Sequence, residues 1–476
     1  MTSVLPGATF RDPAGSLSFE DNLVVRRIGA SSREAVLDFL ASSFCRAMQR
    51  RGDLIDAAID DSDNFDSARN SEAGLRLLHP KIPLPSYPWE WTPAQWLAAA
   101  ELTLNLCDEA LKEGWILKDA TPLNVLFTGT HPIFVDILSF ERRDPQSSIW
   151  LAYGQYVRTF LLPLLMNRML SWPLSLSLLK RDGYEPSELF AVLSWRLRLS
   201  RAALWPITLP ALLERRKVAQ TVSNKPPPRI SDPEVAGDVL ARTIGKLRGR
   251  TQRAVVKTAT SGWSQYQDTL THYTPEQSRQ KQAWVRRAID ISRPERVLDI
   301  GANTGEFSAL AASMGAQVVA LERDVASADR LFLMSRQRNL AIQTIHADLA
   351  RPTPAVGWDN SESLALLPRL EGQFELVLML AVIHHLLLME QIPLPAIVAL
   401  CHRLTRRHLI IEWVPVEDPM YQSLMRGRDA LYGSITEADL LAACTGTGRF
   451  RKLDSERLEN GRTLFLFEKL EGAVSH

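Results

Sequence analysis

Asp299, a glycine-rich turn and Glu322 have the residue types and the spacing of a ligand-binding site. Asp299 lies near the end of an apolar run, and the turn at residues 301–305 follows it directly. Glu322 comes at the end of the next apolar run, residues 318–321. A strand, a glycine turn, a helix and a second strand ending in an acid form the arrangement in which open α/β sheets bind nucleoside-containing ligands. The spacing therefore predicts a cofactor site.

The glycine positions distinguish the common classes of nucleoside cofactor. A dinucleotide fingerprint, G-x-G-x-x-G, has its second glycine where a pyrophosphate approaches the backbone. Counted from Gly301, the second glycine position holds Asn303 and the third holds Glu306, while Gly305 lies one residue out of register. We therefore expect a cofactor other than NAD.

Further strand-like runs supply the elements that must position this site. Residues 297–307 are typical of a buried strand, a tight turn and the start of a helix. A third strand-like run precedes Asp348, residues 374–386 contain a fourth strand and the loop after it, and residues 408–413 form a fifth. These runs predict an α/β fold with an open sheet, whose ligand lies at the carboxyl ends of the strands.

The ordered motifs resemble those of class I S-adenosylmethionine-dependent methyltransferases over roughly residues 260–470. The pattern D-x-G-x-N-x-G at residues 299–305 is similar to the family's motif D/E-x-G-x-G-x-G, with Asn303 at the middle glycine. Asn is among the few other residues enriched at positive φ. The resemblance implies a Rossmann-like, seven-stranded, mostly parallel methyltransferase sheet and S-adenosyl-L-methionine as the cofactor.

The family pattern also implies roles for individual residues. Asp299 would hold the ammonium end of the cofactor, Glu322 both ribose hydroxyls and Asp348 the adenine amino group. Turn or helix capping is the alternative for Asp299 and Asp348. Gly301 and Gly305 would let the backbone approach the methionine part, because they lack Cβ. The implied cofactor-binding residues are Asp299, Gly301, Asn303, Gly305, Glu322, Asp348 and Ala381.

The histidine pair His384-His385 follows the fourth strand, next to the methyl position that the resemblance implies. Either imidazole could act as general base toward a hydroxyl, because histidine titrates near neutral pH. A structural role in fixing the loop is the alternative. Tyr266 and Tyr273 precede the first strand, where the family's aromatic segment closes over the cofactor, and ordinary helix packing is their other interpretation.

The N-terminal half contains a second candidate site. Asp119, Asn124 five residues later, and Asp136 at the end of an apolar run resemble the catalytic and metal-binding segments of aminoglycoside-phosphotransferase-like kinases. In such kinases the first Asp is the base, and the Asn and second Asp hold magnesium. Leu117 stands where a histidine is usual, and no glycine-rich phosphate loop is found in residues 20–80. The interpretations are a degenerate kinase-like recognition domain, an unrelated helical domain with a β-hairpin, or an active phosphotransferase.

Length and proline content predict the domain organisation. A chain of 476 residues exceeds one ordinary core, and residues 223–229 contain three prolines, which favour an extended spacer. We predict an N-terminal α+β domain at 1–222, a proline-containing and basic linker at 223–250 and the methyltransferase domain at 251–476. The basic stretch from Lys246 to Lys257 is interpreted as a solvated helix face or as a patch for an anionic ligand.

Composition excludes several classes of protein. Apolar residues make up 46%, charged residues 23%, and the formal net charge of +1 gives no clear nucleic-acid signal. The four cysteines form no C-x-x-C pair, so no metal site is predicted. The most apolar stretch, residues 160–179, includes Asn167 and Arg168, which favours buried helices over a transmembrane segment. A peripheral membrane contact is the alternative. No signal peptide is recognisable, so we expect a cytoplasmic protein.

Together the two halves resemble two-part bacterial methyltransferase-like proteins related to the nodulation protein NoeA, on the segments 118–122 and 411–420. We predict a methyltransferase that acts on a small-molecule or glycan substrate, at oxygen. The alternatives are a non-catalytic scaffold that binds S-adenosylmethionine and an ATP-dependent phosphotransferase in the N-terminal half.

Overall fold

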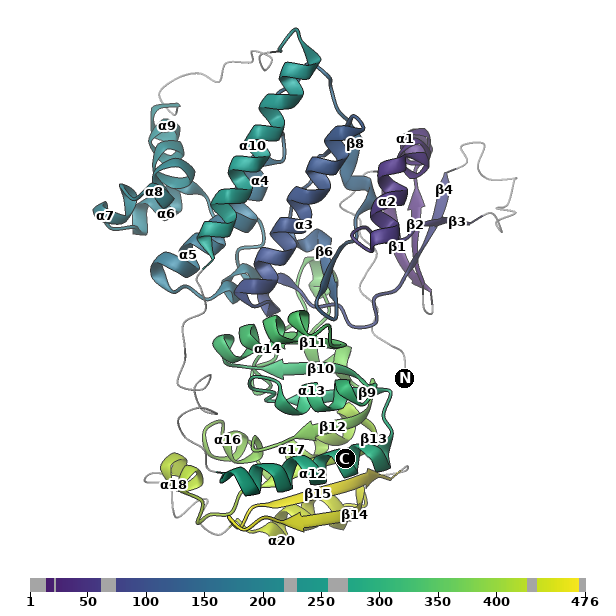
Figure 1. Ribbon diagram of the computed structural model, residues 1–476, viewed down its shortest axis with the longest axis vertical. Helices are drawn as coiled ribbons and strands as arrows, with labels where there is room; N and C mark the ends of the chain where they lie inside the picture. Colours follow the sequence, from purple (N-terminus) through teal and green to yellow (C-terminus); the bar gives the residue numbers. More distant parts are fainter. Residues whose placement is uncertain are drawn as a thin grey trace. The chain divides into compact units, whose positions relative to one another are not determined.

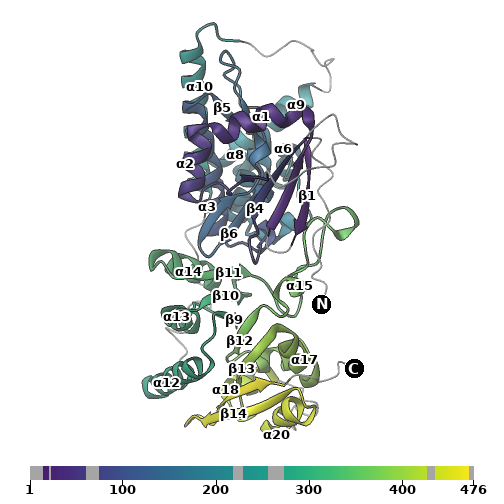
Figure 2. The same cartoon turned by 90° about the vertical axis from the view of Figure 1, so that its right-hand side faces the viewer.

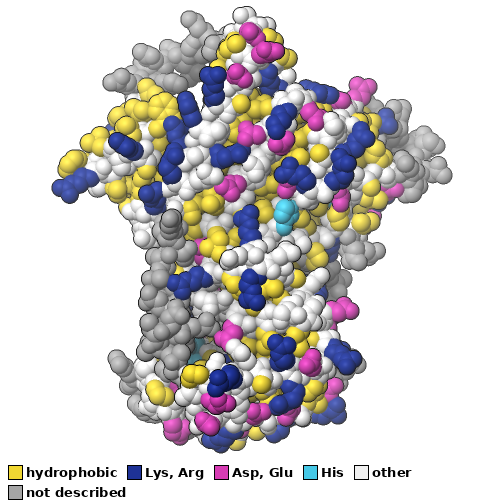
Figure 3. All heavy atoms as spheres, in the orientation of Figure 1, with side chains coloured by type: hydrophobic (Ala, Val, Ile, Leu, Met, Phe, Trp, Pro, Cys, Tyr) yellow, Lys and Arg dark blue, Asp and Glu magenta, His cyan; other side chains and the backbone are white. Residues whose placement is uncertain are grey.

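The computed structural model describes residues 14–20, 23–60, 74–217, 229–255, 273–425 and 435–470. It divides into two compact units (Figure 1). Unit 1 comprises Met1–Lys257 with Val356–Ser363, and unit 2 comprises Thr258–Ala355 with Leu364–His476. The face in Figure 3 carries both basic and acidic side chains.

Unit 1 contains a four-stranded antiparallel sheet, two short β-ribbons and a set of helices. The sheet has the order β1-β2-β4-β3, and the ribbons pair β5 with β8 and β6 with β7. The strands are β1 (Gly15–Glu20), β2 (Leu23–Ile28), β3 (Ala58–Ile59), β4 (Leu75–Pro80), β5 (Trp115–Leu117), β6 (Val125–Thr128), β7 (His131–Phe134) and β8 (Phe140–Arg142). The helices are α1 (Ala30–Ala41), α2 (Ser43–Arg51), α3 (Pro93–Lys112), α4 (Tyr153–Tyr156), α5 (Leu162–Leu170), α6 (Pro186–Val192), α7 (Trp195–Arg198), α8 (Arg201–Ala203), α9 (Leu209–Lys217) and α10 (Pro233–Ala254). Short helical turns are η1 (Pro88–Glu90), η2 (Pro122–Asn124), η3 (Ile137–Ser139), η4 (Val157–Leu161), η5 (Leu174–Leu178) and η6 (Leu204–Thr208). The prediction of a separate α+β domain is confirmed.

Helix α10 occupies residues 233–250, which the sequence analysis assigned to a linker. Leu240, Ile244 and Leu247 repeat at helical spacing, are fully buried, and lie on a helix that packs along α3 (Figure 1). The interpretation of the basic stretch as a solvated helix face already implied a helix here, but not its buried side or its contact with α3. The proline-containing residues 223–228 lie outside the described part of the chain, whereas α10 belongs to unit 1.

The first part of the apolar stretch at residues 160–179 is core. Phe160, Leu162 and Leu164 are almost completely buried, and α5 ends before Ser171, whose φ is 56°. Over the described residues, no helix has both the length and the apolar character needed to cross a bilayer.

Unit 2 contains a seven-stranded sheet with the order β11-β10-β9-β12-β13-β15-β14, in which β15 alone runs opposite to the other strands. The strands are β9 (Arg296–Ile300), β10 (Gln317–Glu322), β11 (Ile342–His346), β12 (Phe374–Met379), β13 (Thr405–Trp413), β14 (Phe450–Arg457) and β15 (Thr463–Lys469). The helices are α12 (Pro275–Ser292), α13 (Glu306–Ser313), α14 (Val325–Gln337), α15 (Leu366–Leu370), α16 (Ile383–Leu388), α17 (Leu394–Leu404), α18 (Pro419–Met425) and α20 (Glu437–Leu441), with the turn η8 (Ala442–Gly446). The segment η7 (Trp358–Asn360) belongs to unit 1. The predicted Rossmann-like, seven-stranded and mostly parallel sheet is confirmed.

Helices cover both faces of this sheet, with α12, α13 and α14 on one side and α15 and α17 on the other (Figure 2). The strands are buried on both faces, which explains their nearly continuous apolar sequences. Helix α12 begins as its sequence predicts, because the Thr274 hydroxyl accepts a hydrogen bond from the Gln277 amide at 3.2 Å and Pro275 is the first helical residue. This helix helps to enclose the carboxyl ends of the strands.

Candidate functional site

A cavity of about 730 Å³ lies at the carboxyl ends of the parallel strands in unit 2. Its walls come from residues 300–303 after β9, 321–324 at the end of β10, 347–349 after β11 and 380–386 after β12. Tyr273, Lys281 and Arg462 contribute from outside these loops. The volume lies within the range of small-molecule and cofactor sites. The cavity therefore occupies the position that the sequence predicts for a ligand.

The glycine turn has the backbone conformation that its sequence requires. Gly301 and Gly305 have φ of 70° and 91°, and Asn303 has φ of 50°, so that Asn replaces the middle glycine in a left-handed conformation. A Cβ at Gly301 would lie 2.4 Å from Val382 Cγ2, and one at Gly305 would lie 2.1 Å from Leu331 Cδ1. Both glycines are thus needed for internal packing.

Glu322 is fixed by the backbone on both sides of its carboxylate. Its Oε2 accepts a hydrogen bond from the Asn303 amide at 2.7 Å, and its Oε1 accepts one from the Asp324 amide at 2.7 Å. The side chain is 9% exposed, and burial raises its pKa against the lowering effect of these amides. Each carboxylate oxygen has a second lone pair. Glu322 therefore lines the cavity in a fixed orientation with acceptor capacity remaining.

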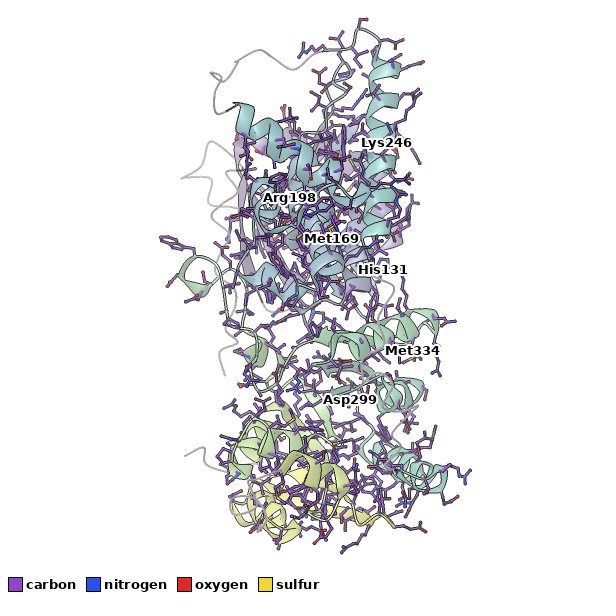
Figure 4. The ribbon with its side chains drawn as sticks, turned by 90° about the vertical axis from the view of Figure 1, so that its left-hand side faces the viewer. His131, Met169, Arg198, Lys246, Asp299 and Met334 are labelled. Atoms are coloured by element: carbon purple, nitrogen blue, oxygen red, sulfur yellow. The ribbon has the colours of Figure 1, made fainter. Side chains whose placement is uncertain are left out.

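Asp299 lies on β9 in the interior of unit 2 (Figure 4) and is 3% exposed. Its Oδ2 accepts a hydrogen bond from the Ser308 hydroxyl at 2.6 Å. Burial raises the pKa of Asp299 to about 6, although the Ser308 hydrogen bond and the Lys281 charge oppose the rise. A carboxylate with this pKa is poised to gain from a cationic ligand group.

Asp348 caps the turn that follows β11. Its Oδ1 accepts a hydrogen bond from the Ala350 amide at 2.9 Å, and its Oδ2 lies 3.2 Å from Arg351 Nη1. Asp348 also lines the cavity. The capping role is therefore present in the structure, while contact with an adenine remains a prediction.

The loop after β12 brings Ala381 to the cavity, and the start of α16 brings His384 and His385. Ala381 has φ of 54°, a conformation that costs free energy for a residue with a Cβ. The two imidazole rings lie 4.2 Å apart between centroids, and His384 is 2% exposed. Burial, with the charges of Arg323 and Arg462, lowers the pKa of His385 to about 4. His385 is therefore neutral at physiological pH.

A buried ionic cluster borders the cavity beside β13, and sequence reasoning identified only Tyr273 within it. Lys281 Nζ donates to Glu412 Oε2 at 2.6 Å, and Arg462 Nη1 donates to the Tyr273 hydroxyl at 2.8 Å. The Tyr273 hydroxyl donates to Glu412, and Arg462 Nε donates to Asp418 Oδ2 at 2.8 Å. Glu412 and Arg462 are 0% and 1% exposed. The two cations keep the pKa of Glu412 below its usual value in spite of burial.

Arg462 has one more feature that bears on ligand binding. Its Nη2 is buried and makes no hydrogen bond with the described residues, although the side chain lines the cavity. An acid at the end of an apolar strand was the available signal for Glu412, whereas Arg462 follows a turn and has no sequence signal of its own. Tyr266 lies outside the described residues.

The three polar residues of the N-terminal candidate site do come together in unit 1. Asn124 Nδ2 donates to Ser139 Oγ at 3.2 Å, and Ser139 Oγ donates to Asp136 Oδ2 at 2.5 Å. Burial raises the pKa of Asp119, as does the Asp136 charge, against hydrogen bonds from Gln155 and Asn124. The convergence is the one that the kinase-like interpretation requires.

The same cluster contains a residue that a kinase-like site does not predict. Arg26, on the sheet strand β2, places its Nη1 2.7 Å from Asp136 Oδ1, and its side chain is 8% exposed. The Arg26 guanidinium thus pairs with the carboxylate that the kinase-like interpretation assigns to magnesium. The described residues contain no group of three or more His, Cys, Asp or Glu side chains suited to a metal ion.

Comparison with known proteins relates the whole chain to one curated protein. No family model matches the sequence. The chain is 29% identical to the nodulation protein NoeA of Rhizobium meliloti (strain 1021) over 483 residues, which span 97% of this chain and 96% of that protein. The predicted resemblance to NoeA-related proteins is confirmed.

Solved methyltransferase structures resemble the chain at low identity. The N-methyltransferase NodS from Bradyrhizobium japonicum WM9 is 12% identical with a TM-score of 0.31, covering 41% of this chain and 98% of that chain. Magnesium protoporphyrin IX methyltransferase (ChlM) from Synechocystis PCC 6803, with bound SAH, is 16% identical with a TM-score of 0.30, covering 41% and 84%. The bifunctional kinase-methyltransferase WbdD is 16% identical with a TM-score of 0.30, covering 42% and 41%.

Proposed function

We propose that this protein is an S-adenosylmethionine-dependent methyltransferase that transfers a methyl group to an oxygen of a small-molecule or glycan acceptor. One observation carries the proposal. A single cavity joins the glycine turn, Asp299 and Glu322 to the histidine pair after β12 and the ionic cluster beside β13. A nucleoside cofactor and an acceptor therefore have adjoining places at the carboxyl ends of neighbouring strands.

The residues of the cavity fit the cofactor chemically. Asp299, with its pKa of about 6, gains from a nearby ammonium group. Glu322 is oriented by two amides and accepts hydrogen bonds from hydroxyl groups. The amides of Gly301 and Asn303 donate to the Leu321 carbonyl and to Glu322, so the turn is held against the end of β10 where both elements line the cavity. We assign the cofactor to these residues, with Asp348 and Ala381 as flanking contacts.

The chemistry requires little of the protein beyond alignment and exclusion of water. The bound cofactor supplies a methyl group already activated on a sulfonium, which an incoming nucleophile displaces in line. The neutral His385 can accept a hydrogen bond that orients an acceptor hydroxyl, whereas its pKa of about 4 makes it a weak general base. Arg462 Nη2 is a buried donor available to an acceptor oxygen. His384 packs against His385 and is proposed as its partner in the same role.

Cofactor binding tests the proposal through Glu322→Gln. The amide removes the charge and one acceptor oxygen and so weakens hydrogen bonds worth about 1–3 kcal/mol. Titration calorimetry of S-adenosylmethionine into the full chain should show affinity falling roughly tenfold to a hundredfold. The matched control is Glu295→Gln, an exposed acid in the same unit. Equal affinity in wild type and Glu322→Gln would mean that the ribose site lies elsewhere.

Turnover distinguishes an enzyme from a protein that only binds the cofactor. Full-length protein is incubated with methyl-tritiated S-adenosylmethionine and a pool of bacterial metabolites and oligosaccharides. Label should move to a product that survives mild base treatment, as an ether does and an ester does not. The scaffold alternative predicts that the wild type binds the cofactor but yields no labelled product beyond those found with the Glu322→Gln variant.

The convergence of Asp119, Asn124 and Asp136 favours a second candidate function, phosphotransfer in unit 1. The Arg26–Asp136 ion pair opposes it, because the guanidinium neutralises the carboxylate that magnesium would need. Titration of magnesium-ATP into the full chain distinguishes an active phosphotransferase from a degenerate domain. Binding that Asp136→Asn abolishes would favour a phosphotransferase, and absence of binding would favour a degenerate domain.

A further inference from the structure

The helical segment from α6 to α9 in unit 1 exposes an unusual concentration of large apolar side chains. Eight of the twenty-one exposed large hydrophobic residues in the described chain fall between residues 192 and 213. They are Val192, Trp195, Leu199, Leu204, Trp205, Leu209, Leu212 and Leu213. Single exposed apolar residues are ordinary, but a contiguous group marks a surface that is covered in the working state.

The same segment is strongly basic. From residue 192 to residue 217 the sequence contains six Arg or Lys residues and one acid, Glu214. Figure 3 has the orientation of Figure 1, and basic and hydrophobic side chains are interspersed where Figure 1 labels α7 to α9. Arg198 of α7 is labelled in Figure 4. The whole chain has a net charge of only +1, so this positive charge is local. A helical surface with Trp and Leu among Arg is typical of proteins that lie in a membrane interface.

A cavity of about 450 Å³ opens beside this segment and combines the same two properties. Leu161, Leu165, Pro206 and Ala254 are buried and form its apolar part. Its polar lining consists of four arginines, and no acidic side chain of the described residues contributes to it; the arginines are Arg168, Arg201, Arg250 and Arg253. An apolar hollow surrounded by guanidinium groups matches a phosphate headgroup attached to acyl chains.

Contacts within the cluster leave the guanidinium groups accessible. Arg168, Arg201 and Arg253 are exposed, and Arg250 is half-buried with its Cζ 5.3 Å from the centre of the Trp205 ring. Arg168 donates a hydrogen bond to the Arg253 carbonyl, which holds both residues at the cavity. The exposed Trp205 thus joins the arginine cavity to the apolar surface.

We propose that α6–α9 and the end of α10 form a docking surface for an anionic membrane, with the arginine cavity receiving a lipid phosphate. A nucleic acid would match the arginines but not the exposed leucines, whereas a bilayer interface accommodates Trp, Leu and Arg together. The surface uses no residue of the cavity in unit 2, so this proposal is independent of the methyltransferase proposal. From the apolar stretch at residues 160–179 it uses only Leu161, Leu165 and Arg168, which line the arginine cavity.

Sedimentation with vesicles tests the proposal on the full chain. Binding is measured to pure phosphatidylcholine vesicles and to phosphatidylcholine vesicles containing phosphatidylglycerol. We expect binding to the anionic vesicles only, weakened by high salt because the attraction is screened. Absence of binding to anionic vesicles at low salt, or equal binding to both vesicle types, would overturn the proposal.

Variants locate the surface. The pair Trp205→Ser with Leu213→Ser, and the pair Arg201→Gln with Arg250→Gln, should each weaken vesicle binding by about tenfold or more. The controls are Ile291→Ser, an exposed apolar residue on α12, and Arg242→Gln, an exposed arginine on α10. Circular dichroism checks that each variant is folded, and the mutated residues are exposed or half-buried.

The variants also separate a membrane from a second copy of the chain. Light scattering over a range of concentrations reports self-association without lipid. If the Trp205→Ser/Leu213→Ser variant no longer forms a dimer but still binds vesicles, this surface is an interface between copies of the chain. If the control variants bind vesicles and the surface variants do not, the result supports a membrane-docking surface.

Discussion

Replacing Asp299 with Asn should stabilise this protein at neutral pH while weakening its proposed cofactor site. Asp299 is buried on β9, and its pKa rises from 3.8 to about 6 because burial outweighs the Ser308 hydrogen bond and the Lys281 charge. Asn has nearly the same shape, and its Oδ1 can accept the Ser308 hydroxyl that now donates to Asp299 at 2.6 Å. The substitution therefore removes mainly the cost of a buried charge.

The magnitude follows from the pKa difference. The pKa of Asp299 rises by about two units, and each unit corresponds to roughly 1.4 kcal/mol. The folded state therefore disfavours the ionised carboxyl by about 3 kcal/mol. Between pH 4 and pH 6 the folded state binds more protons at this site than the unfolded chain. Stability therefore falls as pH rises through this window, and the loss is complete above it. The Asn variant should be more stable than wild type by about 2–3 kcal/mol at pH 7.5 and nearly equal to it at pH 4.

Urea unfolding of both proteins at several pH values between 4 and 8 measures this difference. The control is Asp290→Asn, an exposed residue on α12 in the same unit. A stability gain for Asp299→Asn that does not change with pH, or a loss at every pH, would refute the reasoning. Calorimetry on the same variant should show weaker S-adenosylmethionine binding, because the proposed ammonium partner has lost its charge.

Two further substitutions test the packing around the cavity. Arg462→Met should destabilise unit 2 by about 3–5 kcal/mol, because it leaves Glu412 buried with one cation fewer; a change below about 1 kcal/mol in urea unfolding would contradict the buried cluster. Gly305→Ala should cost more than Gly315→Ala, because both glycines have a positive φ but only a Cβ at Gly305 would meet Leu331. The strain common to both is about 1–3 kcal/mol, and equal melting temperatures of the two variants would show that Leu331 moves aside without cost.

Local sequence signals were sufficient for the frame of the C-terminal unit. Apolar runs buried on both faces, a turn with glycine at φ of 70° and 91°, and the cap at Thr274 are short-range features that few other structures can satisfy. The resemblance to kinase-like segments led us to expect Asp119, Asn124 and Asp136 to lie together, and in unit 1 they do. The assignment of Asn303 to a positive φ is confirmed for the same reason: the preference belongs to the residue and its immediate neighbours.

Long-range contacts decided what those signals could not. Lys281, Glu412 and Arg462 are separated by up to 181 positions, so only the parallel sheet and the packing of α12 bring them together. The Arg26–Asp136 pair spans 110 positions, and it gives an ion-pair partner to a carboxylate that the motif alone assigns to a metal. A helix in the basic segment was expected, but only its packing against α3 shows that α10 belongs to unit 1 and is not part of a linker. Sequence by itself determines local conformation and periodicity, whereas the charge state and partners of a buried group depend on every element that packs against it.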